Sequence, residues 1–180
     1  LANNLNGVSL IVCAETYSKH INKFDRSTSA IFSDGGSVFY FSKKTLKVLK
    51  TFKFFRRDSY EDLCSKEKNL FMDGKKVYDF VNHEVIKLLK SILVKNKNIK
   101  VLFNHQASLT VENLIKDKLK QFKLKIPSNI RKIGNTCSAS IPHLINEYLK
   151  KNKFSRNNEI LICGFGVGLS VTASILKIIK

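Results

Sequence analysis

The sequence predicts one α/β unit, a layered sandwich in which helices flank a mixed β-sheet. The chain has 180 residues, and a hydrophobic content of 43% is enough to bury a sizeable core. Short apolar runs of strand length alternate with longer segments that have helical spacing. Neither an internal repeat nor a Gly- or Pro-rich linker divides the sequence. Such an alternation of strands and helices is typical of an α/β layer architecture.

The expected strands are short and are bounded by turn residues. Residues 8–14 form a continuous apolar run, which indicates a strand buried on both faces. The Asp-Gly-Gly segment at 34–36 predicts a turn between strands at 29–32 and 37–41, because glycine permits positive φ. The other expected strands are 47–55, 99–103, 160–164 and 169–178.

Three segments have the apolar spacing of helices. In residues 75–95 an apolar residue recurs every third or fourth position, which predicts one long amphipathic helix with its entrance at Asp73. The same period appears in residues 109–124, and residues 138–150 predict a third helix. Residues 56–69 are polar and irregular, and predict a loop or a short helix.

The chain is strongly basic, with a formal net charge of +18, but only five of its 32 basic residues are arginine. Proteins that read nucleic acids usually rely on arginine for bidentate contacts to phosphates and bases. Here lysine is spread along the whole chain, which favours a general composition bias over a nucleic-acid site. A Lys-rich module that binds a polyanion remains an alternative, and weak anion binding is expected in either case.

Cysteine spacing and the length of the apolar runs argue against a metal site and a membrane-spanning segment. Cys13, Cys64, Cys137 and Cys163 lie too far apart for a paired metal-binding knuckle, so we expect reduced, mostly buried thiols and no metal site. No apolar run reaches the ~20 residues of a membrane span, which predicts a soluble protein. The first residue is Leu1 rather than Met, which predicts a piece of something longer.

Three segments are candidates for a functional role, because they begin where expected strands or turns end. In α/β proteins, reactive groups are commonly placed at such positions. His105 directly follows the strand at 99–103, although an isolated histidine is more often structural. Asn135 lies in a Gly- and Ser-rich segment before a helix, where a plain turn role is common. Three glycines in residues 164–168 expose backbone N–H groups suited to an oxyanion, and a simple hairpin turn explains them equally well.

The residue sequences of these segments, and their order along the chain, resemble those of a known family. The segments are His-Gln-Ala at 105–107, Ile-Pro-Ser-Asn-Ile at 126–130, Gly-Asn-Thr-Cys-Ser-Ala-Ser-Ile-Pro at 134–142 and Gly-Phe-Gly-Val-Gly-Leu-Ser at 164–170. Together they resemble the C-terminal part of β-ketoacyl-acyl-carrier-protein synthase III. Residues 12–15, 32–36 and 72–78 also look like the family's strand, its Gly-Asp-Gly segment and the entrance of its long helix.

The resemblance implies a thiolase-like fold, whose complete form has two similar halves. Residues 1–42 would then be the tail of the N-terminal half, and residues 43–180 the C-terminal half. In this family a cysteine in the first half accepts the acyl group from a coenzyme A thioester. That nucleophile would lie upstream of Leu1, and none of the four thiols matches it, so we expect the chain alone to be inactive.

The resemblance also assigns site residues. His105 and Asn135 match the family's catalytic histidine and asparagine, which hydrogen-bond the carbonyl of a malonyl thioester. Two neutral donors at that oxygen would stabilise the enolate that forms when CO₂ leaves. For His105 to donate through Nε2, another contact must fix its tautomer. Val167 stands where a backbone N–H serves the oxyanion hole, and Gly166 would shape the same turn.

The activity implied is decarboxylating condensation of a short acyl-CoA with malonyl-acyl-carrier protein at the start of fatty acid synthesis. The resemblance further implies a cytoplasmic homodimer that uses acyl-CoA as substrate and needs no cofactor. Ser108 and Thr110 depart from the family's usual asparagine and basic residue, which leaves open a thiolase-fold acyltransferase acting on a hydroxyl or amine. Lys116, Lys118 and Lys120 would form a basic face for the acidic carrier, or simply a solvated helix face.

Overall fold

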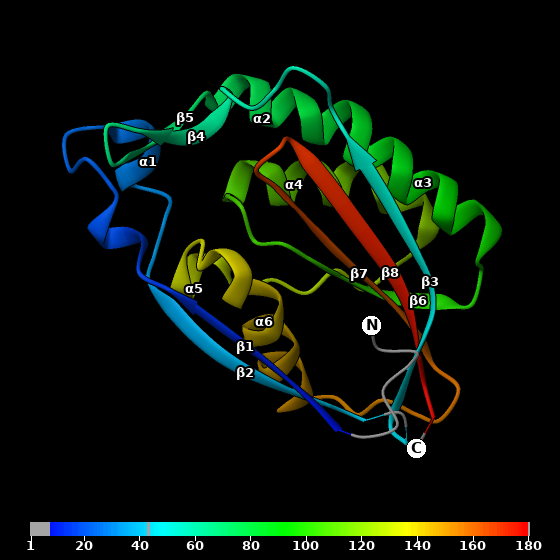
Figure 1. Ribbon diagram of the computed structural model, residues 1–180. Helices are drawn as coiled ribbons and strands as arrows, with labels where there is room; N and C mark the ends of the chain where they lie inside the picture. Colours follow the sequence, from blue (N-terminus) through cyan, green and yellow to red (C-terminus); the bar gives the residue numbers. More distant parts are fainter. Residues whose placement is uncertain (1–7, 43, 180) are drawn as a thin grey trace.

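The protein is built in layers, with helices outside and between two β-sheets (Figure 1). The computed structural model describes residues 8–42 and 44–179. Its larger sheet has the strand order β3 (Leu46–Phe55), β8 (Ser170–Ile178), β7 (Glu159–Gly166) and β6 (Ile99–Asn104). β6 and β7 are parallel, whereas β8 is antiparallel to both of its neighbours. The predicted mixed sheet is therefore confirmed.

A long helical segment covers one face of this sheet, as the spacing of residues 75–95 predicted. It runs from α2 (Gly74–Phe80) through a π-helical turn (Val81–Val85) into α3 (Ile86–Lys95). The Asp73 carboxylate caps its start by accepting a hydrogen bond from the Lys76 N–H at 3.0 Å. α4 (Leu109–Leu119) and a 3₁₀ turn (Lys120–Phe122) lie on the same face.

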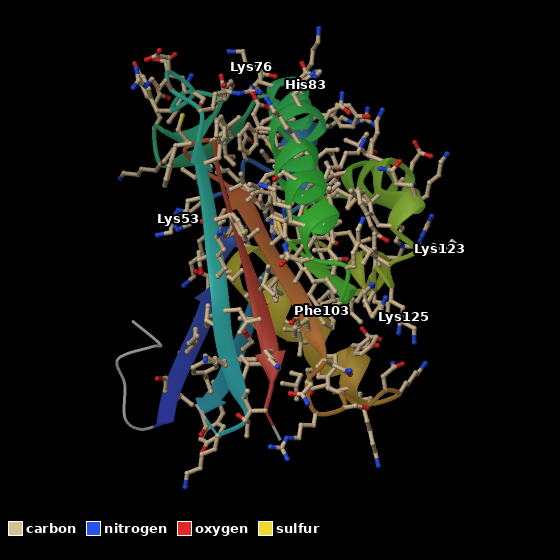
Figure 2. The ribbon with its side chains drawn as sticks, turned by 90° about the vertical axis from the view of Figure 1, so that its right-hand side faces the viewer. Lys53, Lys76, His83, Phe103, Lys123 and Lys125 are labelled. Atoms are coloured by element: carbon tan, nitrogen blue, oxygen red, sulfur yellow. The ribbon has the colours of Figure 1, made fainter. Side chains whose placement is uncertain are left out.

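α6 (Ser140–Leu149) covers the other face and lies between the two sheets (Figure 1). Its buried Leu144 and Ile145 pack in one cluster with Phe103 of β6. Phe103 is fully buried and meets the Tyr148 ring edge-on, with 5.3 Å between centroids. Figure 2 shows Phe103 beside the strands of the larger sheet. Because Leu102 packs on the opposite face, β6 is buried on both faces.

The smaller sheet pairs β1 (Val8–Glu15) with β2 (Gly35–Ser42), antiparallel. Phe39 of β2 packs towards α6, but the opposite face exposes Leu10, Val12, Val38 and Tyr40, each more than 60% accessible. The prediction that residues 8–14 are buried on both faces is therefore wrong. The physical reason is that β1 has one strand neighbour and, within the described residues, helical cover on one face only.

Two further sequence-based expectations are wrong. Residues 29–32 do not form a strand, because Ser29 ends a short helix, α1 (Arg26–Ser29), which is capped by Asp25. Residues 56–69 hold strand structure, because β4 (Leu63–Lys66) pairs with β5 (Asn69–Met72) in a hairpin. With only Leu63 buried and its partner Met72 half-buried, the hairpin is too short and too polar to show a clear period of two.

Other findings bear on the function classes considered above. No helix among residues 8–42 and 44–179 combines the length and apolarity needed to cross a membrane. The same residues contain no cluster of three or more His, Cys, Asp and Glu side chains that could hold a metal ion. The four cysteines are free, as expected, but only Cys163 is buried, so the expectation of mostly buried thiols is wrong.

Candidate active site

One cavity of about 710 Å³ brings together the residues that the sequence singled out. His105, Asn135, Gly166 and Val167 all line it, although they come from three separate segments of the chain. The side chains of Met72, Tyr78, Ile141 and Phe165 supply much of its apolar wall. The three lysines of α4 are not among its lining residues.

The parallel pairing of β6 with β7 brings His105 to the cavity. The two strands end at the same edge of the sheet, and the His105 N–H donates to the Cys163 carbonyl at 2.8 Å. The imidazole then meets the Phe165 ring edge-on, with 5.2 Å between centroids and an interplanar angle of 78°. The histidine that follows β6 and the glycine-rich turn that follows β7 are therefore neighbours.

The imidazole of His105 has a defined partner on α6. Its Nδ1 lies 2.8 Å from the hydroxyl of Ser140, a fully buried residue that itself donates to the Cys137 carbonyl at 2.8 Å. Burial lowers the pKa of His105 to about 4, and a hydrogen bond with the Cys137 carbonyl opposes this shift less strongly. The ring is therefore neutral at pH 7.

Asn135 is held through both its backbone and its side chain. Its backbone pairs with residues 31–33, where the Ser33 N–H donates to the Asn135 carbonyl at 2.8 Å and the Asn135 N–H donates to the Ile31 carbonyl at 3.1 Å. The side chain is almost fully buried, and its Oδ1 accepts a hydrogen bond from the Cys137 N–H at 2.9 Å. Nδ2 is thus the amide atom that can donate into the cavity.

Two glycines allow the turn around Asn135, here called the asparagine turn, to lie close to the start of β2. Gly134 has φ of 69° and ψ of −162°, a combination that essentially only glycine adopts, and a Cβ there would collide with the Ser33 hydroxyl. A Cβ on Gly35 would lie 2.7 Å from the Thr136 Cβ. Gly35 therefore serves close packing within β2, and the turn predicted at 34–36 is not present.

The glycine-rich turn after β7 is fixed by a segment that the sequence had left irregular. The Ser59 hydroxyl lies 2.8 Å from the carbonyls of both Arg56 and Gly168, and the Arg56 N–H donates to the Leu169 carbonyl at 2.9 Å. The Arg56 guanidinium is bidentate to Glu84 at 3.2 and 2.6 Å, which ties the same segment to the long helix. Sequence spacing gave no signal for the role of Ser59.

Cys137 contributes a thiol to the cavity wall, but this thiol is a poor nucleophile. Partial burial raises the pKa of this thiol to about 12 and outweighs the hydrogen bond from Tyr17, which would lower the pKa. Tyr17 belongs to a 3₁₀ turn (Tyr17–Lys19) and stacks on Phe32 with 5.2 Å between ring centroids. Burial also raises the pKa of Cys163 to about 12.

The three lysines on α4 differ in their surroundings. Lys116 forms an ion pair with the buried carboxylate of Glu112, and Lys120 pairs with Asp117 at 3.1 Å. Lys118 is exposed to solvent. Figure 2 shows Lys123 and Lys125 pointing outward nearby, so basic groups continue beyond the end of the helix.

Two family models match this chain. The family model for 3-oxoacyl-[acyl-carrier-protein] synthase III matches residues 2–54, and the model for the C-terminal part of the same enzymes matches residues 89–178. The chain belongs to this family. The resemblance seen in the sequence is therefore confirmed.

Individual relatives give the extent of the match. The beta-ketoacyl-[acyl-carrier-protein] synthase III of Streptococcus agalactiae NEM316 is 32% identical over 189 residues, covering 94% of this chain and 58% of the relative. The synthase III of Clostridium novyi NT is 29% identical over the same shares. This chain therefore spans about three fifths of the length of these relatives.

Solved structures confirm the thiolase-like fold. The 3-oxoacyl-[acyl-carrier-protein] synthase III of Aquifex aeolicus VF5 superposes with a TM-score of 0.82 at 26% identity, covering 95% of this chain and 58% of that one. The corresponding enzyme of Thermus thermophilus gives a TM-score of 0.83 at 23% identity, covering 95% and 59%.

Substituting Gly134 tests the close approach at the asparagine turn. We expect Gly134→Ala to lower the free energy of unfolding by about 1–3 kcal/mol, because the φ and ψ angles at this position are strained for any residue with a Cβ. Gly164→Ala is the matched control, since a Cβ there has no neighbour within 4 Å. Denaturant unfolding measures both variants, and equal stabilities would contradict this account of the turn.

The depressed pKa of His105 predicts a pH-dependent stability. Between pH 6.5 and about pH 4 the unfolded histidine takes up a proton that the folded one does not, so stability falls as pH falls through this window. The contribution is at most roughly 3 kcal/mol. His105→Gln should flatten the pH profile of the unfolding free energy. His83→Gln, at an exposed helical position labelled in Figure 2, should leave it unchanged, and parallel profiles for all three proteins would contradict the prediction.

Proposed function

We propose that this chain is the C-terminal part of an enzyme that condenses a short acyl-CoA with malonyl-acyl-carrier protein, with loss of CO₂. The observation that carries the proposal is that His105 and Asn135, thirty positions apart, line one cavity with a neutral imidazole and an oriented amide donor. The relatives named beta-ketoacyl-[acyl-carrier-protein] synthase III support the same reaction.

The proposal includes the organisation of the complete enzyme. Residues 1–42 belong to its N-terminal half and residues 43–180 to its C-terminal half, and the nucleophilic cysteine lies upstream of Leu1. The inert thiol of Cys137 supports this placement, because its raised pKa leaves no thiolate in the cavity at pH 7. The complete enzyme would be a cytoplasmic homodimer that begins fatty acid synthesis.

In this mechanism the carbonyl oxygen of the malonyl thioester binds between His105 and Asn135. Loss of CO₂ places negative charge on that oxygen, and the Asn135 Nδ2 group, oriented in advance by the Cys137 N–H, stabilises it. A donor fixed before the charge forms favours the transition state over the ground state. The enolate carbon then attacks the acyl-enzyme carbonyl, whose oxygen binds the Val167 N–H beside Gly166.

Replacing Asn135 tests the decarboxylation step. In the full-length enzyme, Asn135→Ala should slow CO₂ release from malonyl-carrier by roughly 10²- to 10³-fold, the usual cost of losing one oxyanion donor. The rate of cysteine acylation by acyl-CoA, measured by intact-protein mass spectrometry, should remain near that of the wild type. Asn113→Ala, an exposed position on α4, is the control. Equal losses in both half-reactions would overturn the assignment.

The same assay separates the other functions. Acyl transfer to a hydroxyl or amine, with neither CO₂ release nor two-carbon extension, would replace the condensation by the second thiolase-fold reaction. A polyanion-binding module instead predicts duplex DNA affinity that falls steeply with salt.

Lys118 is the α4 lysine best placed to meet the acidic carrier protein, because Lys116 and Lys120 already pair with carboxylates. We expect Lys118→Glu to raise the KM for malonyl-carrier severalfold at low ionic strength and to have little effect at high salt, where surface charges are screened. Lys87→Glu, an exposed substitution on α3, changes the net charge equally and serves as the control. Indistinguishable KM values for the two variants would rule out this docking face.

A further inference from the structure

The hydrogen bonds around the inner edge of the His105 ring connect three groups in a row. The Nδ1 atom lies 2.8 Å from the Ser140 hydroxyl, which lies 2.8 Å from the Cys137 carbonyl. Ser140 has no accessible surface, so water does not compete for its hydroxyl. Its position at the first residue of α6 fixes this hydroxyl between the ring and the preceding turn.

The direction of these hydrogen bonds follows from the number of protons available. A carbonyl oxygen can only accept, and a serine hydroxyl has one proton to donate. When Ser140 gives that proton to the Cys137 carbonyl, its oxygen is left to accept a proton from Nδ1. The Ser140 hydroxyl therefore favours a proton on Nδ1.

We propose that Ser140 is a positioning residue that holds neutral His105 in the Nδ1–H tautomer, so that Nε2 presents a lone pair to the cavity. The family resemblance implied that Nε2 is a hydrogen-bond donor. In the free protein Nε2 is instead an acceptor. Nothing in the sequence distinguishes Ser140 from an ordinary helix-entry serine, because its effect depends on a ring that lies 35 positions earlier.

The chemical consequence rests on the proposed function. Nε2 can donate to the malonyl carbonyl only after it takes up a proton, and the attacking cysteine supplies one. The S–H bond breaks as the Nε2–H bond forms, the sulfur attacks the acyl-CoA carbonyl, and coenzyme A leaves as a thiolate that is protonated by solvent. After condensation the released cysteine thiolate takes the proton back from Nε2. His105 and Asn135 then have different roles, because only Asn135 is a donor from the start.

Imidazole nitrogen NMR tests the tautomer without any substrate. In protein labelled with ¹⁵N-histidine at pH 7, we expect the His105 signals of a protonated Nδ1 and an unprotonated Nε2, assigned by their loss in His105→Gln. Ser140→Ala should move both signals towards intermediate positions, since one acceptor of the Nδ1 proton is removed. Ser140→Thr, which keeps the hydroxyl, should restore the wild-type pattern.

Controls separate a local effect from a loss of fold. Ser138→Ala removes an exposed hydroxyl from the same turn and should leave the His105 signals unchanged. The backbone amide spectrum of each variant checks the fold. A protonated Nε2 in the wild type, or identical imidazole signals in wild type and Ser140→Ala, would overturn the proposal.

A kinetic measurement adds a second readout. In the full-length enzyme, Ser140→Ala should slow cysteine acylation about tenfold, in line with the loss of one hydrogen bond, and Ser140→Thr should recover most of the rate. An unchanged acylation rate in Ser140→Ala would refute the proton uptake by Nε2. The NMR result stands independently of the condensation assay, so failure of the proposed function and failure of the tautomer assignment are distinguishable.

Discussion

The geometry of the site depends on one steric constraint, which is the close approach of the asparagine turn to the start of β2. Side chains are excluded at both Gly35 and Gly134, because a Cβ at either position would collide with Thr136 or Ser33. Only then do the backbones come near enough for Ser33 and Asn135 to hydrogen-bond. This contact fixes the turn before α6, and so it sets where an amide from one layer stands relative to a histidine from another.

Cys137 connects the two functional side chains through its backbone. Its N–H orients the Asn135 amide, and its carbonyl receives the Ser140 hydroxyl that contacts His105. Both side chains are thus oriented by a single residue, which sits in a left-handed conformation with φ of 48°. Groups held in this way need no reorganisation when charge appears, and preorganisation of that kind is the main source of electrostatic catalysis.

The sequence predicted those parts of the structure whose signal is local. The long helix after Asp73 and the buried strand before His105 follow from the periodicity and the continuity of apolar residues, and both are confirmed. Gly35 and Gly36 were visible, but the sequence could not tell a turn from a close approach, because that depends on Thr136 about a hundred positions away.

For the same reason, the sequence did not predict which strand face is exposed or which side chains contact a distant segment. The apolar residues of β1 match a buried strand in composition, and only the arrangement of layers shows that one face is uncovered. Ser59 and Ser140 look like ordinary turn and helix-entry serines until the segments that they touch are placed beside them. A pattern within one segment carries no information about a partner in another.

The low polarity of the cavity keeps its histidine and its cysteine neutral in the free protein. Among the described residues that line it, Glu15 alone carries a formal charge, and its carboxylate accepts a hydrogen bond from the Ser138 N–H. The same burial lowers the pKa of His105 and raises that of Cys137, so both stay uncharged at pH 7. In the proposed reaction, a negative oxygen formed there would be stabilised by fixed dipoles such as the Asn135 amide. The α4 lysines proposed to meet the acidic carrier do not line the cavity, so the proposed carrier contact and the proposed enolate chemistry are separated in space.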